Sequence, residues 1–159
     1  MPAGPAQPEA LPARMSLPDL TEYLSLSTLT LATASPDGQP HAAPVYFAAV
    51  DGQQLYFFSA QSSRHAQDTA ASAAAAAAIY PECFGWGEIR GLQMQGEVHP
   101  VAPGAQWEHA WDAYQAKFPF VSELRQVVER STLYSFTPHW IRLVDNRRGF
   151  GFSQEWSLP

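Results

Sequence analysis

The most densely polar segment of the chain lies between Ser59 and His65 and contains three serines, an arginine and a histidine. It falls where a strand predicted over residues 55–59 ends and a helix capped by Ser62 or Ser63 begins. A helix N-terminus presents free backbone N–H groups and a positive dipole end, and hydroxyls with a guanidinium add donors that suit a phosphate. These residues predict a phosphate-binding site, although an ordinary cap with a solvated arginine would have the same sequence.

Other common reaction centres are not indicated by the residues. The histidines at positions 41, 65, 99, 109 and 139 have no i, i+2 or i, i+4 spacing on one element, so we expect no metal site. No G-x-S-x-G nucleophile elbow is found, and the Gly-Trp-Gly and Gly-Phe-Gly triplets are typical of turns rather than dinucleotide sites. The single cysteine, Cys83, excludes an internal disulfide. We therefore name no catalytic residue.

The composition of the chain excludes several classes of partner. The 159 residues are 46% hydrophobic and 15% charged, with a net charge of -6, which argues against binding nucleic acid through phosphate contacts. No apolar run approaches the roughly 18 to 20 residues of a membrane helix, and the N-terminus lacks a secretory signal. We expect a cytoplasmic domain that binds neither nucleic acid nor membranes.

The chain divides into a short arm and one domain. Residues 1–15 are rich in proline and alanine and predict a disordered arm, and the domain runs over 16–159. A short helix is expected to begin at Ser16 and end near Ser27. Strands over 28–35, 39–50 and 55–59, joined by tight turns, predict an antiparallel meander. Two prolines in the second strand indicate an edge, a bulge or a strand whose backbone faces a ligand.

The second half of the chain contains an ambiguous alanine run. Residues 70–80 favour a helix by intrinsic propensity, with a strand over 74–80 as the alternative. Aromatic residues at 107, 111 and 114 share one helical face and are interpreted as packing rather than as a ligand box. The further elements expected are a long strand over 88–101, helices over 103–118 and 121–130, and strands over 133–144 and 150–156. Six or seven strands with few helices predict a barrel of the α+β class.

Four segments in order carry a family resemblance. They read LATASPDGQPHAAPVYF, LYFFSAQSSRHAQ, IRGLQMQGEV and WIRLVDNRRGFGF. Together they resemble the FMN-binding split-barrel proteins related to pyridoxamine 5'-phosphate oxidase, and most of all a small bacterial branch of unassigned function. Each segment alone is weak, but the ordered set is specific and spans about Ser16 to Trp156.

The resemblance implies an antiparallel split β-barrel with peripheral helices, in which residues 74–80 form a strand. It also implies a homodimer with two FMN sites at its interface. The second strand would lie along the flavin, the Arg-His pair would grip the phosphate, and the late segment would come from the partner chain. The cofactor-binding residues implied in this way are Ala43, Pro44, Val45, Tyr46, Phe58, Ser59, Ser63, Arg64, His65, Gln93 and Asn146.

Departures from the family pattern narrow the expected function. The family's substrate-binding lysine is replaced by Ala48, and its late R-x-H is replaced by Arg142-Leu143-Val144. We therefore expect an FMN-dependent oxidoreductase that does not act on vitamin B6. A histidine at position 65, where the family has lysine, makes the charge of the site depend on pH. The alternatives are a non-enzymatic flavin carrier or sensor, a haem or deazaflavin protein on the same fold, and an interaction domain whose arm recruits partners.

Overall fold

A computed structural model describes residues 18–51 and 53–159. The arm over 1–15, the start of the helix at Ser16 and the glycine of the 51–52 turn lie outside the described residues. The described strands form one antiparallel sheet in the order β2-β1-β5-β6-β7-β4-β3, with β8 paired to β7. The predicted α+β split barrel is therefore confirmed. The strands are β1 (Thr28–Ala34), β2 (Pro40–Tyr46), β3 (Ala48–Val50), β4 (Gln54–Ser59), β5 (Ala74–Ile79), β6 (Arg90–Pro100), β7 (Thr132–Asp145) and β8 (Ser153–Ser157).

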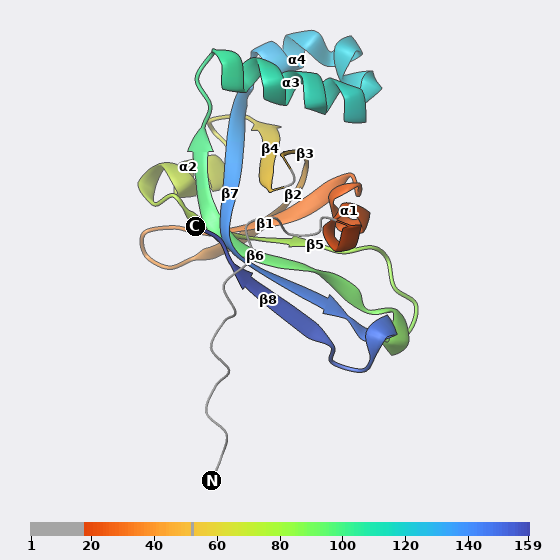
Figure 1. The fold of residues 1–159 in the computed structure, drawn as a ribbon. Coiled ribbons are helices and arrows are strands. Elements are labelled where there is room, and N and C mark those ends of the chain that lie inside the picture. Colours follow the sequence, from red (N-terminus) through yellow and green to blue (C-terminus); the bar gives the residue numbers. More distant parts are fainter. Residues whose placement is uncertain (1–17, 52) are drawn as a thin grey trace.

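The two long strands β6 and β7 run through the whole molecule (Figure 1). The first part of β7 pairs with β4 and its last part pairs with β8. Strand β7 bulges at His139, which is the extra residue opposite Gln95 and Gly96 of β6, and a Cβ on Gly96 would meet the Thr137 carbonyl and Pro138. Only glycine fits this close approach, and the bulge bends the strand so that the sheet can curl.

Helices cover one end of the long strands, and a hairpin forms the other end. Figure 1 shows α3 and α4 at one end of the long strands and the β8 hairpin at the other. The described residues contain no helix that is long and apolar enough to cross a membrane. The helical elements are α1 (Pro18–Leu24), α2 (Arg64–Ala71), α3 (Ala105–Lys117) and α4 (Arg125–Glu129), with 3-10 turns η1 (Trp86–Glu88), η2 (Pro119–Leu124) and η3 (Asn146–Arg148).

The core lies on the concave face of the sheet. Along β1, Leu29, Leu31 and Thr33 point inward and are buried, as the period of two in a strand requires. Helix α1 closes one side of this core with Leu20 and Tyr23, which are each 1% exposed. Each large apolar side chain buried here contributes about 1.5–3 kcal/mol to folding.

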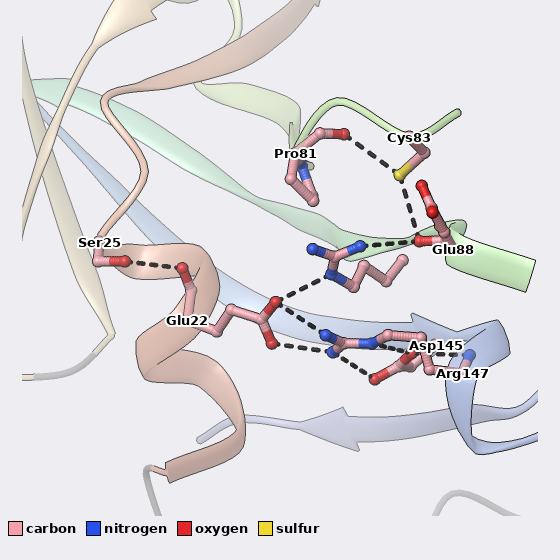
Figure 2. Close-up of polar contacts among 8 residues, drawn as sticks. Glu22, Ser25, Pro81, Cys83, Glu88, Asp145 and Arg147 are labelled. Carbon is pink, nitrogen blue, oxygen red and sulfur yellow. Dashed lines mark hydrogen bonds and ion pairs between the residues drawn. The ribbon is translucent and has the colours of Figure 1, made fainter. Parts of the chain in front are cut away.

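Helix α1 is also tied to the far end of β7 by charged groups. Glu22 accepts hydrogen bonds from both Nη atoms of Arg147, at 3.2 and 2.9 Å, and from Nε of Arg90 at 2.9 Å. Arg147 in turn pairs with Asp145 at 2.8 Å. Figure 2 shows Glu22, Asp145 and Arg147 meeting between α1 and the turn after β7.

The alanine run forms β5, as the resemblance implied and propensity alone did not. It pairs with β1 on one side and β6 on the other, and Ala77 and Ile79 are buried in the core. Two neighbouring strands thus override the helix propensity of alanine.

Several expected boundaries are corrected by the structure. The strand expected over 39–50 is two strands, because Phe47 leaves the pattern: its ring is fully buried and its N–H bonds to Ser27 O at 3.2 Å. The last strand begins at Ser153 rather than at residue 150, because Gly149 and Gly151 adopt positive φ in a turn. The first helix ends at Leu24 rather than near residue 27, and the helix expected over 121–130 opens as a 3-10 turn.

Candidate functional site

The predicted phosphate-binding segment forms the junction of β4 and α2. Ser63 is the N-cap of α2, with extended backbone angles and a side chain that accepts the Ala66 N–H at 3.3 Å. The backbone N–H groups of Arg64 and His65 make no hydrogen bond within the described part of the chain. The helix therefore offers two free donors and its positive dipole end at this junction.

A chain of polar groups connects His65 to this cap. The Nε2 atom of His65 lies 2.7 Å from Ser59 Oγ, and the Ser59 hydroxyl donates to Ser63 Oγ at 3.1 Å. With that direction of donation, Ser59 accepts from the Nε2–H of His65. The hydroxyl proton of Ser63 then remains available to a ligand.

Burial controls the charge of His65, which is 9% exposed. Desolvation lowers the pKa of its imidazole below the ordinary value, and the neighbouring His41 lowers it further, while Asp68 partly opposes them. The ring is therefore neutral at pH 7 when the site holds no anion.

Arg64 and Asp68 form the charged part of the junction. Arg64 Nε lies 3.2 Å from Asp68 Oδ1, and the hydroxyl of Thr33 donates to Asp68 Oδ2 at 2.8 Å. The carboxylate is 4% exposed, whereas the arginine side chain is 45% exposed. Its two Nη atoms make no hydrogen bond in the described residues, so they can bind an anion in a bidentate manner.

His41 joins this cluster from β2. Its ring lies parallel to that of His65, with centroids 6.3 Å apart and planes inclined by 13°. The sequence analysis treated His41 only as one of five scattered histidines. The sequence signal for His41 was the period of two along its strand. His41 lies two residues before Ala43, on the strand expected to follow the flavin, so the two side chains share a face.

Strand β2 forms an edge of the sheet, because it pairs only with β1 among the described strands. The hydrogen bond from Phe47 N to Ser27 O ends the β1–β2 ladder and shows which residues of β2 form hydrogen-bonded pairs with β1. The backbone groups of the odd-numbered residues of β2 therefore face β1, and those of Ala42, Pro44 and Tyr46 face the open edge. Pro44 accordingly loses no ladder bond, which is why a proline is accepted there.

Phe58 turns its side chain away from the junction. Its ring packs against Trp107, Trp111 and Tyr114 of α3, with centroid distances of 6.3, 5.8 and 5.1 Å. These contacts also support the interpretation of the α3 aromatic residues as packing. Only the backbone of Phe58 lies beside Ser59.

Gln93 and Asn146 are not brought to the junction within one chain. Gln93 is exposed on the outer face of β6. It is paired with Ala78, which is paired with Thr30, which is paired with Pro44 of β2. Three strand spacings therefore separate Gln93 from β2, or about 14 Å. Asn146 opens η3, where its side chain bonds Trp86 O at 2.7 Å. It lies beside Arg90, about 25 Å along β6 from the end that contacts α2.

The structure thus assembles two regions of the predicted site. One is the junction cluster of Ser59, Ser63, Arg64 and His65, to which Thr33, His41 and Asp68 are added. The other is the open edge of β2 from Ala43 to Tyr46, where Val45 is half-buried and Tyr46 is exposed. Within the described ranges no group of three or more His, Cys, Asp or Glu side chains could hold a metal ion.

Comparisons with known proteins agree with this architecture. Residues 20–145 match the family described as pyridoxamine 5'-phosphate oxidase. A pyridoxine/pyridoxamine 5'-phosphate oxidase of Cupriavidus pinatubonensis is 34% identical over 99 residues, which are 62% of this chain and 42% of that enzyme. A UPF0306 protein of Enterobacter sp. is 29% identical over 111 residues, which are 70% of this chain and 74% of that protein.

A solved structure shares the fold. The structure of a heme binding protein from Mycobacterium smegmatis superposes with a TM-score of 0.73 at 17% identity, covering 91% of this chain and 59% of that one. At this identity the likeness concerns the fold alone. The chain spans less than half the length of the curated oxidases that it matches. The family match nevertheless covers most of the chain, from α1 to the end of β7, and the chain therefore belongs to the pyridoxamine 5'-phosphate oxidase family.

Proposed function

We propose that this protein is a flavoprotein that binds FMN, with the phosphate at the N-terminus of α2 and the ring system along the open edge of β2. The observation that carries the proposal is the junction cluster, in which Ser59, Ser63, Arg64 and His65 meet two unbonded backbone N–H groups. A phosphate monoester needs this kind of donor set.

The open edge of β2 suits the other half of the cofactor. The pyrimidine side of a flavin carries carbonyl and N–H groups. At the open edge the carbonyls of Ala42 and Pro44 supply acceptors and the N–H groups of Ala42 and Tyr46 supply donors, while the Tyr46 carbonyl already accepts from the Tyr114 hydroxyl at 3.4 Å. The residues present therefore fit FMN at both ends. When bound, the cofactor would supply hydride or electron transfer, while the chain contributes binding, orientation and electrostatics.

We infer that the substrate differs from a vitamin B6 phosphate. Ala48, at the position of the family's lysine, is 1% exposed and packs with Tyr114 and Phe118 under α3, so no cation reaches the site from there. In the segment that replaces R-x-H, Arg142 is paired to Glu155 at 3.5 Å and Val144 is apolar. A vitamin B6 phosphate would therefore lack both the lysine and the R-x-H segment as binding partners. The proposed activity is an FMN-dependent oxidoreduction of another substrate.

We also propose a homodimer. One chain holds the phosphate end and the β2 edge, whereas Gln93 and Asn146 lie elsewhere on the same chain. A second copy that brings its late segment to the flavin would complete two equivalent sites, as a two-fold symmetric pair requires.

A visible absorption spectrum tests the cofactor. The protein is mixed with FMN, and the excess is dialysed away; retained bands near roughly 370 and 450 nm are expected for a bound flavin. Arg64→Ala should lose them. Arg125→Ala is the matched control, because Arg125 also pairs with an acidic residue four positions later, Glu129, but in the exposed α4.

The outcomes separate the competing functions. No retained flavin in the unsubstituted protein would overturn the proposal, and a Soret band with added haem would favour haem binding. Bound FMN that is not reduced by NADH or NADPH would indicate a carrier or sensor rather than an oxidoreductase.

A further inference from the structure

We propose that His41 and His65 act as a proton-accepting pair that completes the phosphate site, so that binding of a phosphate monoester is accompanied by proton uptake. This rests on the proposed function, because it concerns the same junction. It adds His41 as a binding residue and makes retention of the flavin dependent on pH.

The geometry of the two rings carries the inference. They come from different elements, β2 and α2, and lie parallel at 6.3 Å. The β1–β2 register places His41 opposite Thr33, whose hydroxyl holds Asp68 of α2. The ring of Phe57 packs with its edge toward His65 at 6.1 Å, so one side of the pair is closed by the apolar core.

The formal side-chain charges around the pair do not by themselves neutralise a phosphate dianion. On α2, the positive charge of Arg64 is matched by the buried Asp68. The turn between β1 and β2 adds the exposed Asp37, and β1 and β4 contribute only the hydroxyls of Thr33 and Ser59 and the Phe57 ring. Apart from the two imidazoles, these groups sum to no positive charge. A bound dianion must therefore favour protonation of the rings beside it.

The hydrogen bonds show where a proton can be accepted. The Nε2–H of His65 is engaged by Ser59 Oγ, whose own proton is donated to Ser63. An incoming proton therefore goes to Nδ1, and the Ser59–Ser63 chain is unchanged. The ring of His41 makes no hydrogen bond within the described part of the chain. Without an anion, the neighbouring His41 disfavours protonation of His65, because like charges at this distance repel.

The test is the affinity for FMN between pH 7 and 9, measured by quenching of flavin fluorescence. Above about pH 7 the phosphate is already a dianion, since its second pKa lies near 6. We expect the affinity to fall with rising pH, by up to about tenfold per pH unit for each proton taken up. Riboflavin, which lacks the phosphate, should show no such slope, and inorganic phosphate as a competitor should show it.

Variants identify the groups. His41→Gln and His65→Gln should each reduce the slope, and His109→Gln, an exposed histidine of α3, should leave it unchanged. His65→Lys should keep tight binding near pH 7 and reduce the slope there, because the ordinary pKa of lysine, about 10.4, lies far above that of histidine, about 6.5. Proton NMR of the imidazoles should show the pKa of both rings raised by inorganic phosphate, a readout that requires no turnover.

A flat FMN affinity from pH 7 to 9, an equal slope for riboflavin, or a slope that survives both glutamine substitutions would overturn the inference while the flavin site stands. Failure to bind FMN at any pH would overturn the proposed function instead. In that case the imidazole titrations with inorganic phosphate still decide whether the pair responds to an anion.

Discussion

At the scale of single residues, Thr33 holds the charged part of the junction in place. It is 6% exposed and donates its hydroxyl to one oxygen of the buried Asp68, while Arg64 occupies the other oxygen. A buried carboxylate is tolerated only when its oxygens are satisfied. Removing the hydroxyl should therefore affect stability more than its size suggests.

Thr33→Val tests this contact with little change of shape. We expect the free energy of unfolding to fall by about 1–3 kcal/mol, because one buried carboxylate oxygen loses its donor. Urea denaturation measures the change. Thr30→Val is the control, since Thr30 lies on the same strand but faces the outer side of the sheet, where about 0.5 kcal/mol or less is expected. An equal loss in both variants would contradict this role of Thr33.

Residue types and spacing alone indicated the core of the junction but not its full membership. Ser59 to His65 are close in sequence, so a capped helix after a strand places them together by local rules. His41 and Thr33 join them only through the β1–β2 register and the packing of α2 on β1. The alternation of β2 could have placed His41 on the face of Ala43, but a single sequence contains no direct signal for its non-local contact with α2.

At the scale of elements, the alanine run shows why the fold needed the resemblance. Local propensity favoured a helix over 70–80, and the outcome was decided by strands β1 and β6, which lie more than ten residues away on either side. The prolines of β2 left an edge, a bulge or a ligand-facing strand open, and the structure shows the first of these, because a proline on an edge strand can turn its missing N–H away from the neighbouring strand.

The charged contacts that tie α1 to η3 predict an acid-sensitive element. Hydrogen bonds from Arg147 hold the pKa values of Glu22 and Asp145 below their ordinary values. Because the folded pKa values are lowered, the stability these carboxylates contribute is present above their ordinary pKa values and is lost as pH falls through the folded ones.

We therefore expect the free energy of unfolding to decrease from about pH 5 to about pH 3, and Arg147→Gln to flatten that decrease. Chemical denaturation at a series of pH values measures both. Arg125→Gln, which breaks the exposed pair with Glu129, should leave the pH profile unchanged. A profile equally steep in Arg147→Gln would show that other carboxylates carry the acid response.

Lys117 anchors the C-terminus of α3 to the segment after α1. Its Nζ donates to Leu24 O at 2.9 Å and to Leu26 O at 2.6 Å, and it lies 3.8 Å from the centre of the Phe47 ring. Burial lowers the pKa of its ammonium to about 8. Between that value and the ordinary one, the unfolded chain binds more protons than the folded chain, so stability rises with pH.

Lys117→Met should lower the free energy of unfolding at pH 7 by about 1–3 kcal/mol, because the two carbonyls lose their donor. It should also abolish the rise in stability that we expect for the unsubstituted protein between about pH 8 and 10. Denaturation curves across that range compare the two proteins. Parallel pH profiles would contradict a titrating Lys117.

At the scale of the whole molecule, the junction cluster and Asn146 lie far apart within one chain, although the resemblance assigns both to the same flavin site. The long strand β6 carries the α2 contact near one end and Arg90, beside Asn146, at the other. No bending of a single sheet brings those ends together. If the site is shared between copies, as we propose, the composition and periodicity of one chain could not predict it, because the contacts concerned would lie outside that chain.

Complementation between two defective chains tests this shared site. Arg64→Ala removes the phosphate contact, and Asn146→Asp alters the late segment while keeping the oxygen that accepts the Gly151 N–H at 3.0 Å. We expect each variant alone to lose FMN. Random pairing in a mixture after subunit exchange makes half of the dimers mixed, and each mixed dimer has one intact site, so about a quarter of the sites should bind FMN again. If each site lies within one chain, the mixture recovers no binding at all, because every chain still carries its own defect.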